Sequence, residues 1–364
     1  MFSILISGLV AEVTEKEACN LVRAFWEEME PFLDKNANIP SGDFIRLASR
    51  LAKTGRENRL SSHLPKFGLS TNIPLTFVDI GLKNTHPVLA VSDYIAAIDA
   101  MNKIDGLLMG NRAPQYEDFW LKWKSLQPSH PVFSQHSGHL GRCIPVAIHA
   151  DEGTSVKKKA LMVLQVQAVM GKGSRKRKAD KMTAGLNLLG NSLKTRMLFS
   201  VLLGRLYSGK KLQNRPLFAL VNHLSMQLHA LYDKGILVTI DGVKQKIFLV
   251  PLAMKGDWPA LSKIGCLVRH HGRVTLATEA GMGICHLCNG GVEGHEAWHN
   301  LSYDNMVSMH TDVPLPWRKD PAFVRHLPMD PAFKAEFFRI DVFHTCHKGL
   351  MADIAANTIE PKLK

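Results

Sequence analysis

Three aspartates occupy positions from which their carboxylates could converge on a metal ion. Asp151 and Asp257 each close an apolar run that predicts a β-strand, and Asp353 lies in a predicted helix that follows a third strand. Divalent ions such as Mg²⁺ and Mn²⁺ prefer oxygen ligands, and a pair of them can promote phosphodiester cleavage. The order of these segments therefore predicts a carboxylate site at one edge of a mixed sheet.

Each aspartate also has a plainer interpretation. Asp257 is followed by Pro259, a pattern typical of a residue that caps the start of a helix. Asp151 suits an ordinary turn, and Asp353 suits the solvated face of a helix. The sequence leaves both interpretations open for all three residues.

A second cluster combines cysteine and histidine. Residues 265–347 contain nine of the 17 histidines and four of the six cysteines, an enrichment that indicates a metal-binding segment. The string CHLCNGGVEGHEAWH has the spacing C-x₂-C-x₆-H-x₃-H, and two thiolates with two imidazoles suit tetrahedral Zn²⁺. Because the usual DNA-reading finger has about 12 residues between its pairs, we predict a structural zinc ion instead. The predicted ligands are Cys285, Cys288, His295 and His299.

Several neighbouring residues compete for the same roles. Asp341, in the string DVFHTCHKG, is an alternative to Asp353 as the third acid. Buried thiols without any metal are the alternative to the zinc site. The substitute zinc ligands are Cys266, His270, His271, His344 and His347.

The composition is that of a basic protein with enough apolar residues for a packed core. The 364 residues are 46% hydrophobic and carry a formal net charge of +13, which favours an anionic partner such as nucleic acid or an acidic membrane surface. The six scattered cysteines indicate a reducing compartment rather than a disulfide framework. No apolar run reaches the roughly 18 residues of a membrane span, and the opening segment lacks the basic start of a signal peptide.

Two basic segments are candidates for contact with phosphates. Either could also be no more than an exposed, solvated loop. If they bind DNA, we expect the affinity to fall steeply with salt. Their residues are Lys157, Lys158, Lys159, Lys172, Arg175, Lys176, Arg177 and Lys178.

The first 135 residues read as a mainly helical region. A capping box at Thr14 and Glu17 predicts one helix start, and Ser41 and Ser92 are predicted to cap two more. The second of these helices has an apolar face made of Phe44, Leu47, Ala48 and Leu51. A short aromatic helix at 116–126 is predicted to bury Phe119, Trp120 and Trp123 in the core.

Residues 136–364 change to an α/β pattern. We predict a hairpin over 143–170 with its turn at Asp151–Gly153, and a further strand at 195–203. A helix at 217–235 closes with Gly235, and a strand pair at 236–257 turns at Asp241–Gly242. A Cys/His-rich insertion at about 265–335 then precedes a short strand and a final helix.

From about residue 143 to 359 the chain resembles the RNase H-like catalytic domain of eukaryotic DDE/D cut-and-paste transposases of the CACTA (En/Spm) type. Three strings carry the resemblance: IPVAIHADEG, the stretch from LYDKGILVTIDG through GDWPALSKIGC to GICHLC, and DVFHTCHKGLMADIAANTI. In that family an aspartate followed by Pro-Ala precedes a Cys-rich insertion, and an Asp-x-x-His step leads to the last acid. Here these are Asp257, then Cys285 and Cys288, then Asp341 and His344.

The resemblance implies an RNase H-like fold with Asp151, Asp257 and Asp353 as a triad that binds Mg²⁺ or Mn²⁺. It implies a nuclear DNA-binding protein that cleaves and transfers DNA strands and acts as a homo-oligomer, with no membrane partner. The chain stops soon after Asp353, and no N-terminal DNA-binding finger is visible. We therefore expect a truncated or decayed copy of the element, so catalytic activity stays open.

Two other function classes fit the same residues. A non-catalytic, zinc-stabilised nucleic-acid-binding or interaction protein would explain the charge and the Cys/His cluster equally well. A hydrolase with catalytic zinc would need a general base such as Glu293 or Glu296 beside the Cys/His ligands.

Overall fold

The computed structural model describes most of the chain from residue 73 onward and one helix before it. The described ranges are 42–55, 73–154, 160–171, 196–269, 283–295 and 298–340, with isolated positions near both ends. Two compact units are present, Met1–Ile73 and Pro74–Lys364. Residues 74–135, which the sequence grouped with the N-terminal helices, belong to the same unit as the sheet.

Many predicted residues lie outside the described ones. These are the capping residues Thr14, Glu17 and Ser41, the acids Asp341, Asp353 and Glu296, the histidines His270, His271, His344 and His347, and the basic residues Lys157, Lys158, Lys159, Lys172, Arg175, Lys176, Arg177 and Lys178.

The first unit contains the predicted second helix, α3 (Gly42–Lys53). Ala48 and Leu51 are buried, as the spacing of apolar residues predicts, and Arg50 is exposed. Three- and four-residue spacing places such side chains on one face of a helix.

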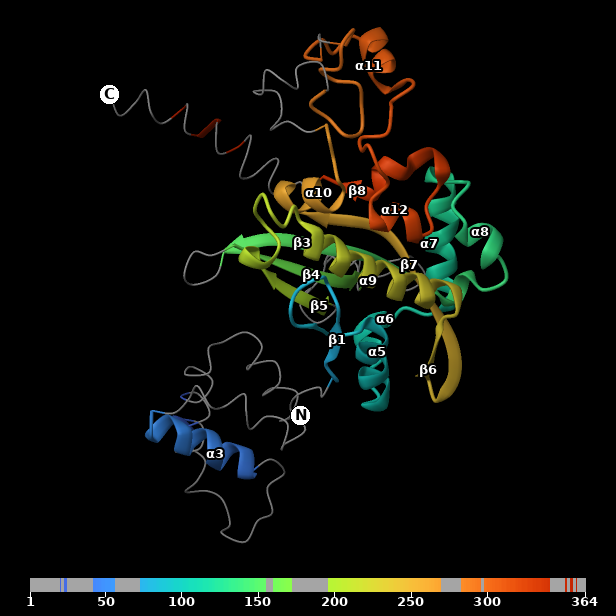
Figure 1. The fold of residues 1–364 in the computed structure, drawn as a ribbon. Helices are drawn as coiled ribbons and strands as arrows, with labels where there is room; N and C mark the ends of the chain where they lie inside the picture. Colours follow the sequence, from blue (N-terminus) through green and yellow to red (C-terminus); the bar gives the residue numbers. More distant parts are fainter. Residues whose placement is uncertain are drawn as a thin grey trace. The chain divides into compact units, whose positions relative to one another are not determined.

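A mixed sheet forms the centre of the second unit (Figure 1). Its strands are β3 (Cys143–Thr154), β4 (Ala160–Ala168), β5 (Arg196–Leu203), β6 (Ile236–Ile240), β7 (Val243–Gly256) and β8 (Phe338–Arg339). The order is β5-β4-β3-β7-β6, and β8 also pairs with β7. The β3–β4, β4–β5 and β6–β7 pairs are antiparallel, whereas β3–β7 and β7–β8 are parallel. The predicted mixed α/β architecture is confirmed.

The β6–β7 hairpin turns where the sequence predicted it. Asp241 has φ 51° and Gly242 has φ 77°, and positive φ at both central residues is typical of the type I′ turn that Asp-Gly favours. Arg112 donates to both carboxylate oxygens of Asp241 at 2.8 Å and to Asp105 at 2.9 Å. The turn is thus joined to the segment before the sheet.

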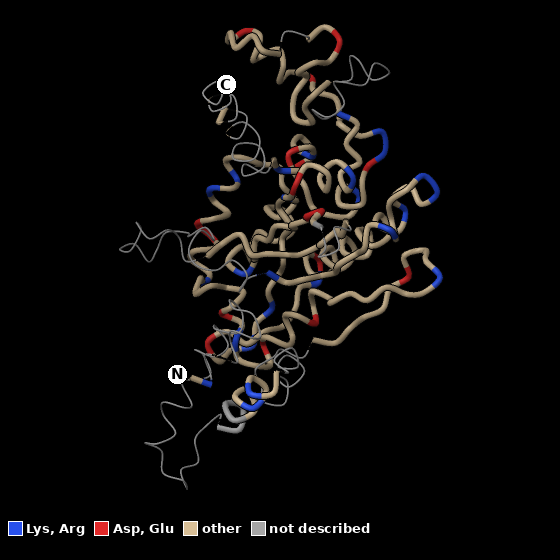
Figure 2. The backbone as a smooth tube through the Cα atoms, turned by 90° about the vertical axis from the view of Figure 1, so that its left-hand side faces the viewer, with Lys and Arg blue, Asp and Glu red and all other residues tan. Residues whose placement is uncertain are grey.

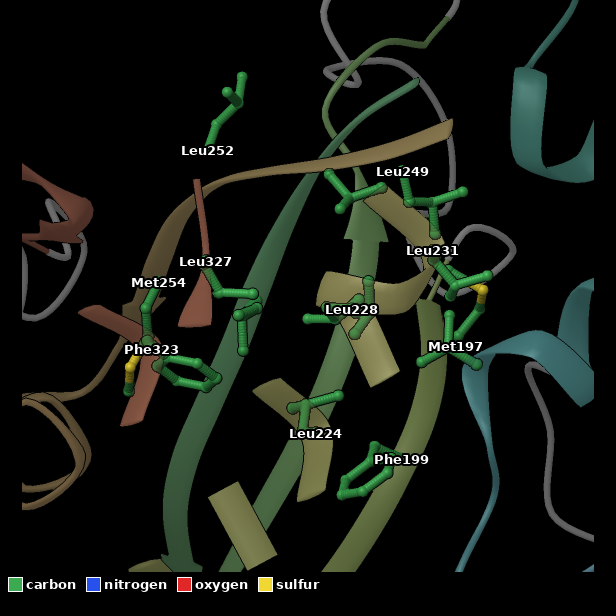
Figure 3. Packing of buried hydrophobic residues seen from close by; sticks show 14 of the residues in the cluster. Met197, Phe199, Leu224, Leu228, Leu231, Leu249, Leu252, Met254, Phe323 and Leu327 are labelled. Atoms are coloured by element: carbon green, nitrogen blue, oxygen red, sulfur yellow. The ribbon is translucent and has the colours of Figure 1, made fainter. Parts of the chain in front are cut away.

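One long helix, α9 (Arg215–Asp233), packs its apolar side on the sheet. Leu224, Leu228 and Leu231 point toward strand residues such as Phe199 and Leu249 (Figure 3). Gly235, with φ 66°, ends the helix as predicted. Within the described parts of the chain, no helix has both the length and the apolar character that crossing a bilayer requires.

The segment before the sheet is less helical than expected. It begins with a two-stranded sheet, β1 (Thr76–Val78) and β2 (His86–Val88). The helix that Ser92 is predicted to cap spans 93–108 in the prediction. In the structure it is divided into α5 (Val91–Ala100) and α6 (Asp105–Leu108), because the left-handed Asn102 (φ 55°) interrupts it. Ala90 precedes α5, and Ser92 lies inside that helix, so the cap predicted for Ser92 is wrong.

The aromatic helix is α7 (Ala113–Leu126), followed by α8 (Val132–Gln135) and the 3₁₀ turn η4 (Leu140–Arg142). Trp120 is fully buried and Phe119 is 8% exposed, so their predicted place in the core is confirmed. Trp123 packs partly buried against the same core. The Trp120 indole N–H donates to the Cys143 carbonyl at 2.9 Å, which fastens α7 to the start of β3.

Short elements complete the unit. They are η6 (Gly204–Leu206), α10 (Trp258–Ile264), α11 (Tyr303–His310), α12 (Ala322–His326) and η9 (Pro331–Phe337). The buried Asp330 accepts hydrogen bonds from Ser129 N–H at 2.9 Å and Ala332 N–H at 3.0 Å. This carboxylate ties the end of the segment 265–337 to the α7–α8 loop, and β8 follows directly.

Candidate catalytic site at the ends of β3 and β7

Asp151 and Asp257 follow the last paired residues of two adjacent parallel strands. The β3–β7 ladder ends with Ala150 opposite Gly256, so the next residue on each strand is one of the predicted acids. Parallel strands run in the same direction, so both acids lie at the same edge of the sheet. The structure therefore brings together the first two members of the predicted triad.

The turn predicted at Asp151–Gly153 is wrong. β3 continues to Thr154 and stays paired with β4, with Asp151 opposite Val163 and Thr154 opposite Ala160. Continuing antiparallel pairing keeps these residues extended, because their backbone groups bond across to β4. Asp151 is thus a strand residue that still pairs with β4, although its pairing with β7 has already ended.

Gly256 allows the two strands to approach closely just before Asp257. A β-carbon at this position would lie 1.8 Å from the Ala150 carbonyl oxygen. No side chain larger than hydrogen fits there without moving the strands apart. The residue type at 256 therefore controls how near Asp257 comes to β3.

Asp257 has two structural contacts through a single carboxylate oxygen. Its Oδ1 accepts from Ala260 N–H at 3.0 Å and from Glu152 N–H at 3.3 Å. The first contact caps α10, whose first turn contains Pro259, so the predicted helix cap is confirmed. The second contact joins the carboxylate to β3, next to Asp151.

The electrostatic environment of Asp257 is that of a crowded carboxylate. Its pKa is raised above the ordinary value mainly by burial, and the charges of Asp151 and Glu152 raise it further, while the two N–H donors act in the opposite direction. These neighbouring carboxylates repel one another, and a divalent cation bound between them would neutralise that repulsion. Their oxygen atoms fit Mg²⁺ or Mn²⁺.

Glu152 is a member of this site that the sequence prediction missed. Its side chain is 11% exposed and forms an ion pair with Lys263 of α10. Tyr207, which follows η6, donates its hydroxyl to Glu152 Oε1 at 2.7 Å. An acid directly after Asp151 was visible in the sequence, but the predicted turn at 151–153 implied that the Glu152 side chain faces solvent.

The third acid lies beyond the described residues. β8 is parallel to β7, with Phe338 opposite Met254 and Arg339 opposite Lys255. The chain that follows it, including both candidates for the third acid, is not among the described residues. Asp151, Glu152 and Asp257 are therefore the carboxylates that can be placed.

Cys285 and Cys288 are close together in the segment after α10. A hydrogen bond between the two thiols is the largest influence that lowers the pKa of Cys285 to about 6 and raises that of Cys288. Leu287 N–H also donates to Cys285 Sγ at 3.3 Å. Arg269 is 4% exposed, donates to the Cys288 carbonyl at 3.5 Å, and its positive charge favours a thiolate at either cysteine.

This cysteine turn is connected to the sheet through His286. The buried His286 bonds to the Phe338 carbonyl of β8 at 2.7 Å, and its ring lies 5.3 Å from that of Trp258 in α10. Asn289 N–H donates to the Met309 carbonyl at 2.8 Å at the end of α11. The turn therefore joins β8, α10 and α11.

Among the described residues, the other candidate zinc ligands are not gathered around the two thiols. His295 lies 3.5 Å from the Ser308 hydroxyl, and His299 is exposed beside Trp298. The thiol of Cys266 is half-buried, and burial raises its pKa. Across the described residues, no three His, Cys, Asp or Glu side chains form a group that could hold a metal ion, at the thiols or at the aspartates.

The described Lys and Arg residues are distributed over many elements, with acidic residues among them (Figure 2). Neither predicted phosphate-binding segment belongs to this part of the chain. The predicted DNA contacts therefore stay predictions.

Comparison with known proteins adds no assignment. No protein-family model matches the chain, and no curated protein matches it significantly. The residues and their arrangement are therefore what indicates the function.

Replacing Gly256 with alanine tests the close approach of the strands. We expect Gly256→Ala to lower the free energy of unfolding by about 1–3 kcal/mol, because the new methyl group overpacks against Ala150. Urea denaturation measures the change. Gly153→Ala is the matched control, since a β-carbon there meets nothing within 4 Å. Equal effects of the two substitutions would contradict the close approach.

The raised pKa of Asp257 predicts a pH dependence in metal-free buffer. Above the unfolded pKa of about 3.9, folded Asp257 keeps a proton that the unfolded chain releases, so its contribution to stability falls as pH rises through the folded pKa. The asparagine introduced by Asp257→Asn would not titrate but would still cap α10. Relative to that variant, the wild-type chain should therefore lose stability as pH rises from the unfolded pKa of about 3.9 through the raised folded pKa of Asp257, measured by urea denaturation.

Asp241→Asn is the control, because the stability contribution of Asp241 should change with pH in the opposite direction. The hydrogen bond from Arg112 lowers the pKa of Asp241, so its contribution is present above the unfolded pKa and is lost as pH falls. If the difference in unfolding free energy between wild type and Asp257→Asn stays constant over this pH range, the pKa of Asp257 is not raised in the folded chain.

Proposed function

We propose that the chain is a transposase-derived, nuclear DNA-binding protein with an RNase H-like domain that carries out metal-dependent DNA strand cleavage and strand transfer. The observation that carries the proposal is the position of Asp151 and Asp257 immediately beyond the last paired residues of β3 and β7. Two acids 106 residues apart in sequence thus reach one sheet edge, as the resemblance to DDE/D transposases requires.

The topology supports the RNase H-like part of the proposal. An RNase H-like sheet has three antiparallel strands in sequence, followed by strands that lie parallel to the first of them. Here β3, β4 and β5 are the antiparallel strands, β7 is parallel to β3, and β8 is parallel to β7. One further strand, β6, lies between α9 and β7 and pairs antiparallel with β7. The Cys/His-rich segment lies between α10 and β8, where the sequence predicted it.

The residues of the site would divide the work as follows. Asp151 and Asp257 would hold Mg²⁺ or Mn²⁺, because both present carboxylate oxygens in a crowded, half-buried setting. When bound, the ion supplies an activated water or hydroxyl and neutralises charge at the leaving oxygen. Oδ1 of Asp257 is occupied by two N–H donors, and no described residue donates to Oδ2. That second oxygen is the one free to bind.

DNA binding is proposed from the charge of the whole chain. A net charge of +13 favours a polyanion. The basic residues at 157–159 and 172–178 would contact backbone phosphates, and a homo-oligomer would bring two DNA ends together. The homo-oligomer follows from the family resemblance, whereas the phosphate contacts follow from the basic sequence of these segments.

We also propose a structural zinc ion at Cys285 and Cys288. Their closeness, the N–H donor to Cys285 Sγ and the link through His286 to β8 support a rigid two-thiolate half of a zinc site. His344 and His347, which lie outside the described residues, would complete it, because His295, His299 and Cys266 are not gathered around the thiols. The same feature favours the second candidate function, a zinc-stabilised nucleic-acid-binding or interaction protein without catalysis.

A nicking assay tests the catalytic proposal. Purified full-length protein is incubated with supercoiled DNA and Mg²⁺ or Mn²⁺, and conversion to the nicked form is followed. Asp151→Asn and Asp257→Asn should each reduce the rate by more than about a hundredfold, since loss of a direct ligand exceeds the about 10–100-fold cost of losing an outer-shell partner. Asp304→Asn, an exposed acid in α11, is the control and should nick at the wild-type rate.

The outcomes separate the two candidate functions. Metal-dependent nicking that needs both aspartates supports the transposase-type site. Binding of DNA without nicking by the wild-type chain, in either metal, favours the non-catalytic protein. Nicking that survives in both variants would mean that the activity comes from elsewhere.

Zinc content tests the second metal site. Protein purified without chelator should contain about one Zn²⁺ per chain by elemental analysis, and Cys285→Ser or Cys288→Ser should remove it because thiolates bind Zn²⁺ far better than hydroxyls. Cys143→Ser, at a buried cysteine of β3, is the control that should keep the zinc. Absence of zinc from the wild-type protein would contradict the site.

A further inference from the structure

We propose that Glu152 is a positioning residue: its main-chain N–H and its Lys263-bound carboxylate together hold Asp257 in place beside Asp151, and Glu152 itself does not bind the catalytic metal. This inference rests on the proposed function. It assigns a role to a residue that neither the sequence patterns nor the family resemblance marks.

The first support is that Glu152 contacts both ends of α10. At the start of that helix, its N–H donates to Asp257 Oδ1 at 3.3 Å, the oxygen that also caps the helix. In the last turn of the helix, Lys263 bonds to its carboxylate. Because α10 has only seven residues, one β3 residue thus fixes the position of the whole helix and of the acid that caps it.

The second support is that both carboxylate oxygens of Glu152 are already occupied. Oε1 accepts the Tyr207 hydroxyl at 2.7 Å, and Oε2 is paired with the Lys263 ammonium. The side chain is 11% exposed and Tyr207 is fully buried. To bind a metal, this carboxylate would have to give up a part-buried ion pair and the Tyr207 hydrogen bond, so metal binding would cost it two existing partners.

The third support is the alternation of side chains along β3. Consecutive residues of a strand point to opposite faces, so Asp151 and Glu152 are directed apart although they are adjacent. Asp151 is therefore left for the metal site, while Glu152 faces η6 and α10. Gly204 in η6 helps to set this arrangement, because a β-carbon there would come within 2.9 Å of Ala160.

The test measures Mn²⁺ binding to the full-length protein by isothermal titration calorimetry, together with urea denaturation. Lys263→Met should weaken Mn²⁺ binding by about 10–100-fold, the usual effect of losing an outer-shell partner. Lys263→Arg keeps a positive charge beside Glu152 and should bind Mn²⁺ more tightly than Lys263→Met does. Lys122→Met, which breaks the exposed 2.8 Å pair with Asp118, is the matched control and should leave binding unchanged.

A double variant distinguishes weaker metal binding from a simple loss of folding. Lys263→Met alone leaves the Glu152 charge without its cation, whereas Glu152→Gln with Lys263→Met leaves no buried charge, an exchange that is often tolerated. The double variant should weaken Mn²⁺ binding as much as Lys263→Met does. If Glu152 were a direct ligand, Glu152→Gln would abolish binding while Lys263→Met left it unchanged or tighter, and that result would overturn the proposal.

A metal-independent measurement separates this proposal from the proposed function. Hydrogen exchange followed by mass spectrometry reports on the peptides that contain the N–H groups of Glu152 and Ala260. In metal-free protein, Lys263→Met should speed exchange in both peptides by about tenfold or more, and Lys122→Met should not. A wild-type chain that binds no Mn²⁺ would end the catalytic proposal, whereas unchanged exchange in Lys263→Met would overturn the positioning role alone.

Discussion

The parallel pairing of β3 with β7 is the constraint on which the candidate site depends. These strands are far apart in sequence, and their ladder ends at Ala150 and Gly256, so the next residues, Asp151 and Asp257, meet at one sheet edge. The pairing in turn requires glycine at 256, where a β-carbon would collide with the Ala150 carbonyl. A backbone contact thus decides whether the two carboxylates can act together. Burial is the main reason that the pKa of Asp257 is raised, and the nearby charge of Asp151 raises it further.

Contacts from several surrounding elements hold the sheet in place. Trp120 fastens α7 to the start of β3, while Asp330 ties the segment before β8 to the α7–α8 loop. His286 connects the Cys285–Cys288 turn to β8 on the far side of β7. Under the proposed function, a zinc ion at those thiols would stabilise the strand that leads to the third acid. The Cys/His segment would then stabilise the sheet edge that holds the acids by way of β8, and it would not contact DNA bases itself.

Periodicity and turn chemistry predicted much of the fold, because these signals are local. The apolar spacing of α3, α7 and α9 and the Asp241–Gly242 turn were recognisable from adjacent residues. The division of 93–108 at Asn102 and the continuation of β3 past Asp151 were not, because they depend on a left-handed residue and on pairing with β4. At the site, strand ends revealed Asp151 and Asp257. Glu152 was missed because its partners, Tyr207 and Lys263, are 55 and 111 residues away.

The position of Mn²⁺ in crystals of the full-length protein would show whether Asp151 and Asp257 share a metal ion. Anomalous scattering at the manganese edge would locate the ion without any assumption about activity. The account predicts a peak bonded to carboxylate oxygens of both Asp151 and Asp257, with Glu152 still paired with Lys263. A peak bonded to Glu152, or one that touches neither aspartate, would contradict it.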